Sequence, residues 1–420
     1  MVCKDCLRYE RSVHNENDEK IYTEHIKEAS RCRNIYNTSR KYIGRNVSVL
    51  SFDFKSLFYL PHNRRVDQSF SFTKKFVYNF FGVVNENNTH HNKFYLTSNQ
   101  LNCSKVDMIC SYLSDYCKEL FEKGITKIIF FADNCISQNK NRYLINFLYF
   151  IMQKYNFKSI SLNFMTVGHT HNSCDRFFGI IQNKLVQHEF ESPIDICKIL
   201  GHEFQVSCLE NIIRYKDLLN DCPEFRGIGS YNSFTFCLNS DQIICHRKMI
   251  DPLLNCSKAD EYYTPYVEFD LMIRNENDRF LSAEICPIPP STIRDYSKTV
   301  LSYVKKVENL KFYLEFLQVG LKMFYLEKSE QKIATQNNRR KEIEEFIQSA
   351  EIGGIDEIDR MVAFEQEIDD TNINKTMNEN EIEKIVCESE FLKVIAHRII
   401  ATRMFVSFRF VSRQLHQEGD

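Results

Sequence analysis

The sequence predicts an α/β fold, with a mixed sheet flanked by helices and a mainly helical C-terminal region. Three β-type segments follow one another early in the chain, and strands then alternate with helices. That order is typical of a hairpin meander continued by crossover units. A long amphipathic segment follows further on. With 420 residues, 43% of them apolar, the chain has enough material for a sizeable core.

The first part of the predicted sheet comes from three segments. Residues 1–45 are polar and helix-permissive, and the texture changes at Asn46. Residues 46–54 form an apolar, β-type run. Two more strands are predicted over 69–84 and 92–97, with an Asn/His-rich turn between them.

Alternating helices and strands come next. Ser104 caps a predicted helix that runs to Lys123, and Gly124 ends it. The run KIIFFA, residues 127–132, is wholly apolar, as expected for a strand inside a parallel sheet. The remaining predicted elements are a helix over 140–154, a strand over 159–167 and a helix over 174–187.

The signal weakens beyond Phe190. We expect a helix over 207–220, short strands over 232–238 and 242–247, a Pro-rich joint and a long helix over 301–327. The basic and apolar end, 391–415, fits a packing helix, a partner-binding segment or a nucleic-acid contact. The predicted organisation is a helical CxxC segment, a core, an accessory α+β region and a helical, acidic C-terminal region, over 1–45, 46–200, 201–300 and 301–420.

Charge is unevenly distributed. Residues 342–390 hold 16 acidic and 3 basic side chains, a local net charge of −13 in a chain of net charge −2. The rest of the chain therefore carries +11. A basic body suits a polyanionic partner, and a solvated helical face explains the acidic segment equally well.

The cysteines and the apolar runs indicate a soluble intracellular protein. The 16 cysteines are scattered through apparent helices and strands, as reduced, buried thiols are. No secretory signal is visible, and the longest apolar run, 143–152, contains Asn146 and is too short to span a bilayer. We expect a nuclear or cytoplasmic protein with no membrane partner.

Three aspartates occupy distinctive places in this order of elements. Asp53 lies in the first strand, Asp133 follows the fourth, and Asp175 opens a late helix. The order of elements is that of the ribonuclease H-like fold, whose acidic residues occupy these three places. We therefore predict a ribonuclease H-like mixed sheet with an acidic site.

Carboxylates in this arrangement suit a divalent metal. An apolar strand gains nothing from a carboxylate that is not paired, hydrogen-bonded or metal-bound. Asp53, Asp133 and Asp175 would hold Mg²⁺ or Mn²⁺ for phosphodiester chemistry. Taken singly, Asp133 also fits a turn residue and Asp175 a charge at a helix N-terminus.

Polar and basic residues surround the second and third aspartates. A loop dense in amides and cations follows Asp133, and histidines precede Asp175. Such side chains either contact phosphates or form ordinary local hydrogen bonds. The predicted DNA contacts are Asn134, Gln138, Asn139, Lys140, Arg142, His169, His171 and Arg176.

A zinc site is a further hypothesis for the N-terminal segment. Cys3 and Cys6 have zinc-ligand spacing, with His25 and Cys32 downstream and His14 also available. A single CxxC without a second clear pair favours the alternative, two buried or frayed thiols.

The motifs around the aspartates resemble those of a widespread domain family of transposon origin. The segments are FFADNCISQNKNRYL and VGHTHNSCDRFFGIIQNK, preceded by LSFDFKSLFYLPH and the CxxC segment. The resemblance covers roughly residues 3–240. It implies a DDE-type transposase core on a ribonuclease H-like fold, with the three aspartates at the acidic positions. It also implies an N-terminally shortened chain, since family members extend further upstream.

Two functions stay open at this point. One is metal-dependent DNA strand cleavage and transfer, with DNA as the partner and homo-oligomers expected. The other is a non-catalytic DNA- or protein-binding module on the same fold. A processive exonuclease is less favoured, because the first strand reads Asp53-Phe54-Lys55 and lacks a DxE pair.

Overall fold

The structure is a computed structural model that divides into two compact units. Unit 1 comprises residues 1–64 and 76–284, and unit 2 comprises 65–75 and 285–420. The residues that the structure describes are 3–11, 16–42, 44–64, 68–88, 91–209, 211–220, 222, 227–237, 242–246, 261–265, 281–349, 379–389 and 392–393.

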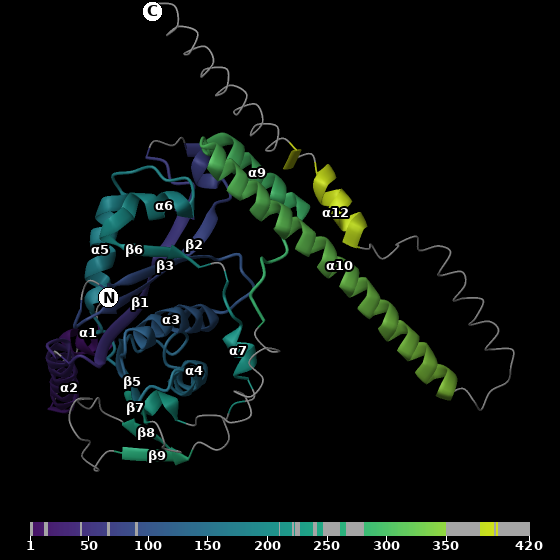
Figure 1. Ribbon diagram of the computed structural model, residues 1–420. Helices are drawn as coiled ribbons and strands as arrows, with labels where there is room; N and C mark the ends of the chain where they lie inside the picture. The colour runs from purple at the N-terminus through teal and green to yellow at the C-terminus, as the bar shows by residue number, and fades with distance from the viewer. Residues whose placement is uncertain are drawn as a thin grey trace, which may run out of the picture. The chain divides into compact units, whose positions relative to one another are not determined.

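Unit 1 is built on a nine-stranded mixed sheet with the order β6-β3-β2-β1-β4-β5-β7-β8-β9 (Figure 1). β2 pairs antiparallel with β1 and β3, whereas β1, β4 and β5 pair in parallel. The strands are β1 (Val47–Leu60), β2 (Phe76–Asn85), β3 (Lys93–Ser98), β4 (Lys127–Ala132), β5 (Ser159–Phe164), β6 (Gln205–Cys208), β7 (Ser233–Cys237), β8 (Gln242–His246) and β9 (Glu261–Pro265).

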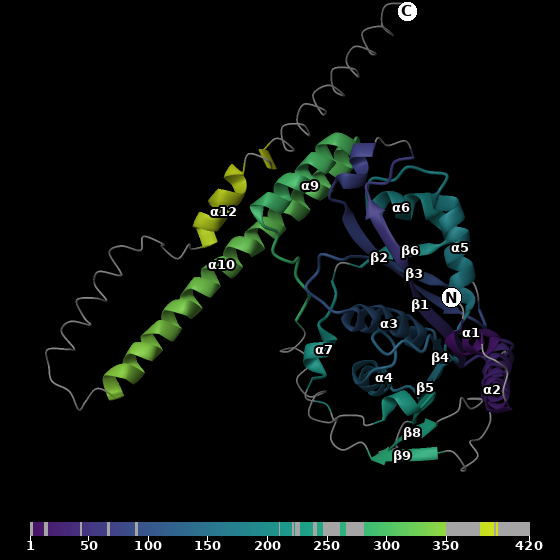
Figure 2. The ribbon, with the colours of Figure 1, turned by 180° about the vertical axis from the view of Figure 1, so that it is seen from behind.

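Helices cover both faces of this sheet, as Figure 2 shows from behind. The helices of unit 1 are α1 (Lys4–Arg11), α2 (Glu16–Arg40), α3 (Lys105–Glu122), α4 (Arg142–Lys154), α5 (Ser173–Leu185), α6 (Pro193–Leu200) and α7 (Tyr215–Leu218), with short 3-10 turns at Gly201–Glu203 and Ile228–Ser230. Along β1, Phe54 contacts Tyr112 of α3, whereas Val49 packs in one cluster with Tyr36 of α2. Because side chains alternate along a strand, Asp53 belongs to the face of Val49. On that face Lys55 reaches Gln182 of α5.

The early part of the predicted order is confirmed. All five strands predicted before residue 170 are present, and so are the three helices between and after them. Ser104 caps α3 through a complete capping box, and Gly124 follows the helix with φ of +75°. The N-terminal end of the strand predicted over 69–84 is instead a 3-10 helix, Gln68–Phe72.

The helix predicted over 207–220 is wrong. Residues 205–208 form β6, which adds to the sheet beside β3, and only Tyr215–Leu218 are helical. Sheet pairing therefore overrides local helix propensity here. α6, which begins at Pro193 after the N-cap Ser192, was not predicted. The strands predicted over 232–238 and 242–247 are present as β7 and β8.

The described part of unit 2 is helical. It contains the 3-10 helix Gln68–Phe72, α9 (Pro290–Tyr303), α10 (Val307–Ser349) and α12 (Glu379–Glu388). The helix predicted over 301–327 is thus shared between α9 and α10. Most of the acidic segment, 351–378, and nearly all of the basic end, 391–415, lie outside the described residues.

Within the described residues, no helix combines the length and apolar character that crossing a membrane requires.

Candidate functional site

Adjacent strands bring Asp53 and Asp133 to the same level of the sheet. Ser51 of β1 pairs with Phe131 of β4, and each aspartate lies two residues further along its chain. Neighbouring strands are about 4.8 Å apart. Asp133 is the first residue after β4, so its carboxylate lies at the carboxyl edge of the parallel strands, where open α/β sheets bind ligands.

Asp175 joins them from the first turn of α5. Its Oδ2 accepts a hydrogen bond of 3.1 Å from the amide of Asn172, and Asn172 Oδ1 accepts from the amide of Cys174 at 2.8 Å. This capping box fixes the start of α5. Asp175 also lies 3.5 Å from Nδ1 of His171, and both side chains are exposed.

The three carboxylates lie close enough to affect one another's ionisation. Burial is the main cause that raises the pKa of Asp53 to about 7; the charges of Asp175 and Asp133 add to the rise, and a hydrogen bond from the Phe54 amide opposes it. Burial also raises the pKa of Asp133, opposed by hydrogen bonds from the Asn134 amide and Thr170, and the charge of Asp175 adds to the rise. Mutual repulsion of this kind favours a bound cation.

Two of the predicted DNA contacts face the protein instead. Asn139 and Lys140 are both 2% exposed. The amide of Asn139 donates to the carbonyl of Asp133 at 3.2 Å, and Lys140 Nζ donates to Gly229 O at 3.1 Å. Burial lowers the pKa of Lys140 to about 8. These side chains therefore shape the loop after β4 rather than present its surface.

The other predicted contacts are more accessible. Arg176 and His171 are exposed, and Asn134, Gln138 and Arg142 are partly exposed. Arg142 stacks over the ring of Tyr143 and donates to Asn220 Oδ1 at 3.4 Å. All five of these accessible side chains remain predicted DNA contacts.

A second cluster of four side chains lies beside the loop between β5 and α5. Cys3 and Cys6 of the N-terminal segment, His25 of α2 and His169 of the loop bring one ligand atom each within 4.8 Å of one another. Cys3 Sγ lies 3.1 Å from His25 Nε2, Cys6 Sγ lies 3.5 Å from His169 Nε2, and the two Nε2 atoms are 3.1 Å apart. These four residues are called the Cys/His cluster below.

The ligand set predicted for zinc needs one correction. Cys32 lies in the apolar cluster between α2 and the sheet, 2% exposed, with Val49 and Phe131. Burial raises the pKa of its thiol to about 11. His169, predicted as a DNA contact, takes the fourth place. Its distance along the chain left no spacing signal to find it. His14 lies outside the described residues.

The loop between β5 and α5 joins the two clusters. His169 belongs to the Cys/His cluster, Thr170 hydrogen-bonds to Asp133, and Asp175 lies in the first turn of α5, which follows the loop. Arg33 of α2 donates to the carbonyls of His169, at 3.0 Å, and His171. The loop is therefore held by Arg33 of α2 on one side and hydrogen-bonded to Asp133 on the other.

Glu86 anchors the same region from inside. Its carboxylate is fully buried and accepts from the hydroxyls of Tyr36, Ser51 and Ser173, with Arg40 Nε at 2.9 Å. These partners come from α2, β1 and the first residue of α5. The sequence predicts a turn at Glu86, and no sequence pattern marks this residue as a buried carboxylate that several elements contact.

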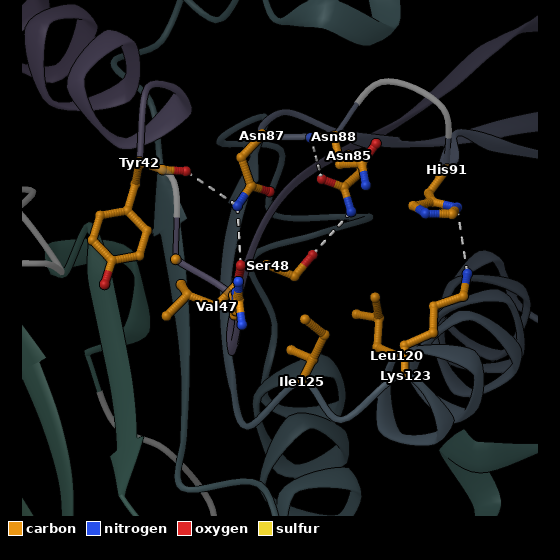
Figure 3. Close-up of a pocket in the computed structure, with 12 residues that line it drawn as sticks. Tyr42, Val47, Ser48, Asn85, Asn87, Asn88, His91, Leu120, Lys123 and Ile125 are labelled. Carbon is orange, nitrogen blue, oxygen red and sulfur yellow. Dashed lines mark hydrogen bonds between the residues drawn. The ribbon is translucent and has the colours of Figure 1, made fainter.

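Two hollows border the described part of the sheet. The first, of about 370 Å³, is at the amino ends of β1 and β4 (Figure 3). There the Asn87 amide donates to Val47 O at 3.0 Å and Tyr42 O at 3.4 Å. It lies at the opposite end of these strands from Asp133. The second, of about 320 Å³, is lined by Lys55 and Gln182 and follows β1 beyond Asp53 on the same face.

Comparison with known proteins gives one match. A family model described as "Domain of unknown function (DUF7869)" matches residues 68–251. The matched region contains Asp133 and Asp175 but neither Asp53 nor the CxxC segment. Neither curated proteins nor solved structures yielded a match.

Proposed function

We propose that unit 1 is a metal-dependent DNA strand-cleavage and transfer domain with a ribonuclease H-like, transposase-derived core. The sheet supports this, because a three-stranded antiparallel meander continues into two parallel strands through helical crossovers. DNA is then the partner, and the nucleus is the expected compartment. Asp53, Asp133 and Asp175 are the proposed catalytic residues.

The convergence of three carboxylates at one edge of the sheet carries the proposal. Burial is the main cause that raises the pKa of Asp53 to about 7, and the charges of Asp175 and Asp133 add to it. A fold that keeps three acids together at this cost in stability gains from a cation between them.

The donor set fits Mg²⁺ or Mn²⁺. Both ions prefer carboxylate oxygens and keep several waters, and the exposed side of Asp175 leaves room for those waters. When bound, such ions activate a water or hydroxyl and stabilise the leaving oxygen. Asp53 and Asp133 supply fixed ligands from the sheet, while Asp175 supplies one from α5.

The surroundings suit a phosphodiester chain. Lys55 lies on the face of Asp53, two residues further along β1, and lines the second hollow together with Gln182. Arg176 is exposed beside Asp175. Cations on both sides of an acidic group can hold the phosphates that flank the reacting one.

Nicking of supercoiled plasmid tests the proposal. Purified full-length chain should nick with Mn²⁺ or Mg²⁺ and not in EDTA, and Asp133→Asn should abolish nicking. The matched control is Glu122→Gln, which removes an exposed charge at the end of α3 and should nick as the wild type does. Absence of nicking with either ion, or equal nicking by Asp133→Asn, contradicts the proposal.

One observation favours the binding module as a second candidate. Asp175 already completes the capping box of α5, and Asp53 already accepts a hydrogen bond from the Phe54 amide, so both have local structural partners. A binding module predicts DNA affinity that falls steeply with salt and no turnover with either ion. The fraction of plasmid bound by the same Asp133→Asn protein, measured at two salt concentrations, separates binding from cleavage.

A further inference from the structure

We propose that Cys3, Cys6, His25 and His169 bind one zinc ion, which fastens the N-terminal helices to the loop between β5 and α5. The ligands come from three places far apart in the sequence: α1 and the residue before it, the middle of α2, and the β5–α5 loop. The loop is 144 residues from His25 along the chain, so a shared ion explains why four ligand-type side chains converge here.

The distances match a tetrahedral ion. With Zn–S near 2.3 Å and Zn–N near 2.05 Å, tetrahedral angles give S···N edges of about 3.5 Å and N···N edges of about 3.3 Å. The observed edges are 3.1 and 3.5 Å for S···N, and 3.1 Å for N···N. Both imidazoles present Nε2 to the same point, as ligands do. Hydrogen bonding alone gives a poorer account, because two Nε2 atoms facing each other share at most one proton unless one ring is charged.

The chemistry of the set selects zinc. Two thiolates and two imidazoles are the ligands of structural Cys₂His₂ zinc sites, and soft sulfur disfavours Mg²⁺ and Mn²⁺. On binding, each thiol loses its proton to solvent, and two Zn–S and two Zn–N bonds form. Two thiolates neutralise the ion, so the assembled site carries no net charge. All four positions of a tetrahedral ion are filled by protein, which is typical of a structural site.

The backbone around His169 is shaped for this approach. Gly168 has φ of +78°, and a Cβ there would lie 2.6 Å from the Cα and Cβ of Cys3. The loop and the N-terminal segment therefore touch at the backbone. Arg33 holds the carbonyl of His169 from α2. Thus the ligand is presented by a loop already in contact with its partner.

Metal content tests the site directly. Full-length chain produced with added zinc and then desalted should hold about one zinc per chain by mass spectrometry of the metal. Co²⁺ offered to apoprotein should give the absorption bands of a tetrahedral, thiolate-ligated ion. A chain that holds no zinc after loading, or Co²⁺ bands of an octahedral ion, would overturn the proposal.

Variants distinguish the proposed ligand set, which contains His169, from the set predicted by spacing, which contains Cys32. His169→Ala should weaken zinc binding by roughly a hundredfold or more, since even an outer partner of a ligand is worth about 10–100-fold. Cys32→Ala should keep its zinc, and so should the matched control His188→Ala, whose side chain is exposed beyond α5. Loss of zinc from Cys32→Ala with retention in His169→Ala reverses the assignment. If His169→Ala does not fold, zinc protection of Cys3 and Cys6 from alkylation in the wild type decides instead.

What this zinc site does for the three aspartates rests on the proposed function. Thr170 bonds Asp133 and lies next to His169, so zinc removal should loosen the loop and lower nicking. Amide exchange over 166–172 should quicken by about tenfold or more in apoprotein, while exchange in β4 stays unchanged. Because zinc content and exchange do not depend on nicking, an inactive protein that binds zinc would contradict the proposed function and leave this site standing.

Discussion

The acidic group (Asp53, Asp133 and Asp175) and the Cys/His cluster both contact the loop between β5 and α5, and they are built on opposite principles. The Cys/His cluster draws soft ligands from three segments into a closed set, with all four ligand atoms within 4.8 Å. The acidic group takes hard ligands from β1, β4 and α5, and leaves Asp175 exposed. Within the described residues, only the Cys/His cluster meets at that closeness. A closed set suits an ion that holds structure, and an open set suits an ion that meets a substrate.

The largest expected effect separates the two clusters by ion. Free zinc at a thousandfold above its Kd would stabilise the fold by about 4 kcal/mol, and Mn²⁺ at tenfold above its Kd by about 1.4 kcal/mol. Urea unfolding of apoprotein, with each ion added in turn, measures both. Equal effects of the two ions, or a Mn²⁺ effect that survives in Asp53→Asn, would remove the distinction.

The next largest effect on stability is expected at Glu86, which joins the elements that carry the two clusters. Glu86→Ala leaves three buried hydroxyls without their acceptor and should cost about 3 kcal/mol. Glu122→Ala, at an exposed position, should stay within about 0.5 kcal/mol of the wild type in the same urea titration. A cost below about 1 kcal/mol for Glu86→Ala would show that the hydroxyls find other partners.

A smaller effect is expected where the loop touches the N-terminal segment. Gly168→Ala places a Cβ 2.6 Å from the backbone of Cys3 and keeps a positive φ, so it should destabilise by about 1–3 kcal/mol. It should also weaken zinc binding, because Cys3 must shift. Gly179→Ala is the matched control, since nothing lies near a Cβ added there. Unchanged zinc affinity in Gly168→Ala would mean that the contact does not position Cys3.

The sequence predicted the acidic group better than the Cys/His cluster, for a physical reason. Asp53 and Asp133 interrupt or end apolar strands, and a carboxylate in such a place is a local signal. Capping by Ser104 and the stop at Gly124 are local in the same way. His169 becomes a ligand only because the fold carries its loop to Cys3, and Glu86 becomes a hub only because α2, β1 and α5 meet at it. Periodicity and spacing carry no information on such contacts between distant segments. The same limit explains β6, whose partner β3 is more than a hundred residues away.

The smallest expected effect is a gain in stability, and it concerns Asp53 in the acidic group. The pKa of Asp53 is about 7 in the fold, above its ordinary value of 3.8. The folded state therefore binds more protons than the unfolded state between about pH 4 and 7, and the charged carboxylate costs stability increasingly as pH rises through that window. Asp53→Asn removes this cost. In metal-free protein we expect a gain of about 1–2 kcal/mol at pH 8, shrinking towards zero near pH 4, after discounting for partial exposure.

The same variant separates a metal site from a structural carboxylate. Wild type should recover the lost stability when Mn²⁺ is added at pH 8, because the cation offsets the repulsion among the three carboxylates. Asp53→Asn should respond little, and zinc should stabilise both proteins equally. Urea titrations at pH 5 and pH 8, with and without each ion, supply every comparison needed. If Asp53→Asn is destabilising at pH 8, the carboxylate of Asp53 is held for its bond to Phe54, and the binding module becomes the better account of this fold.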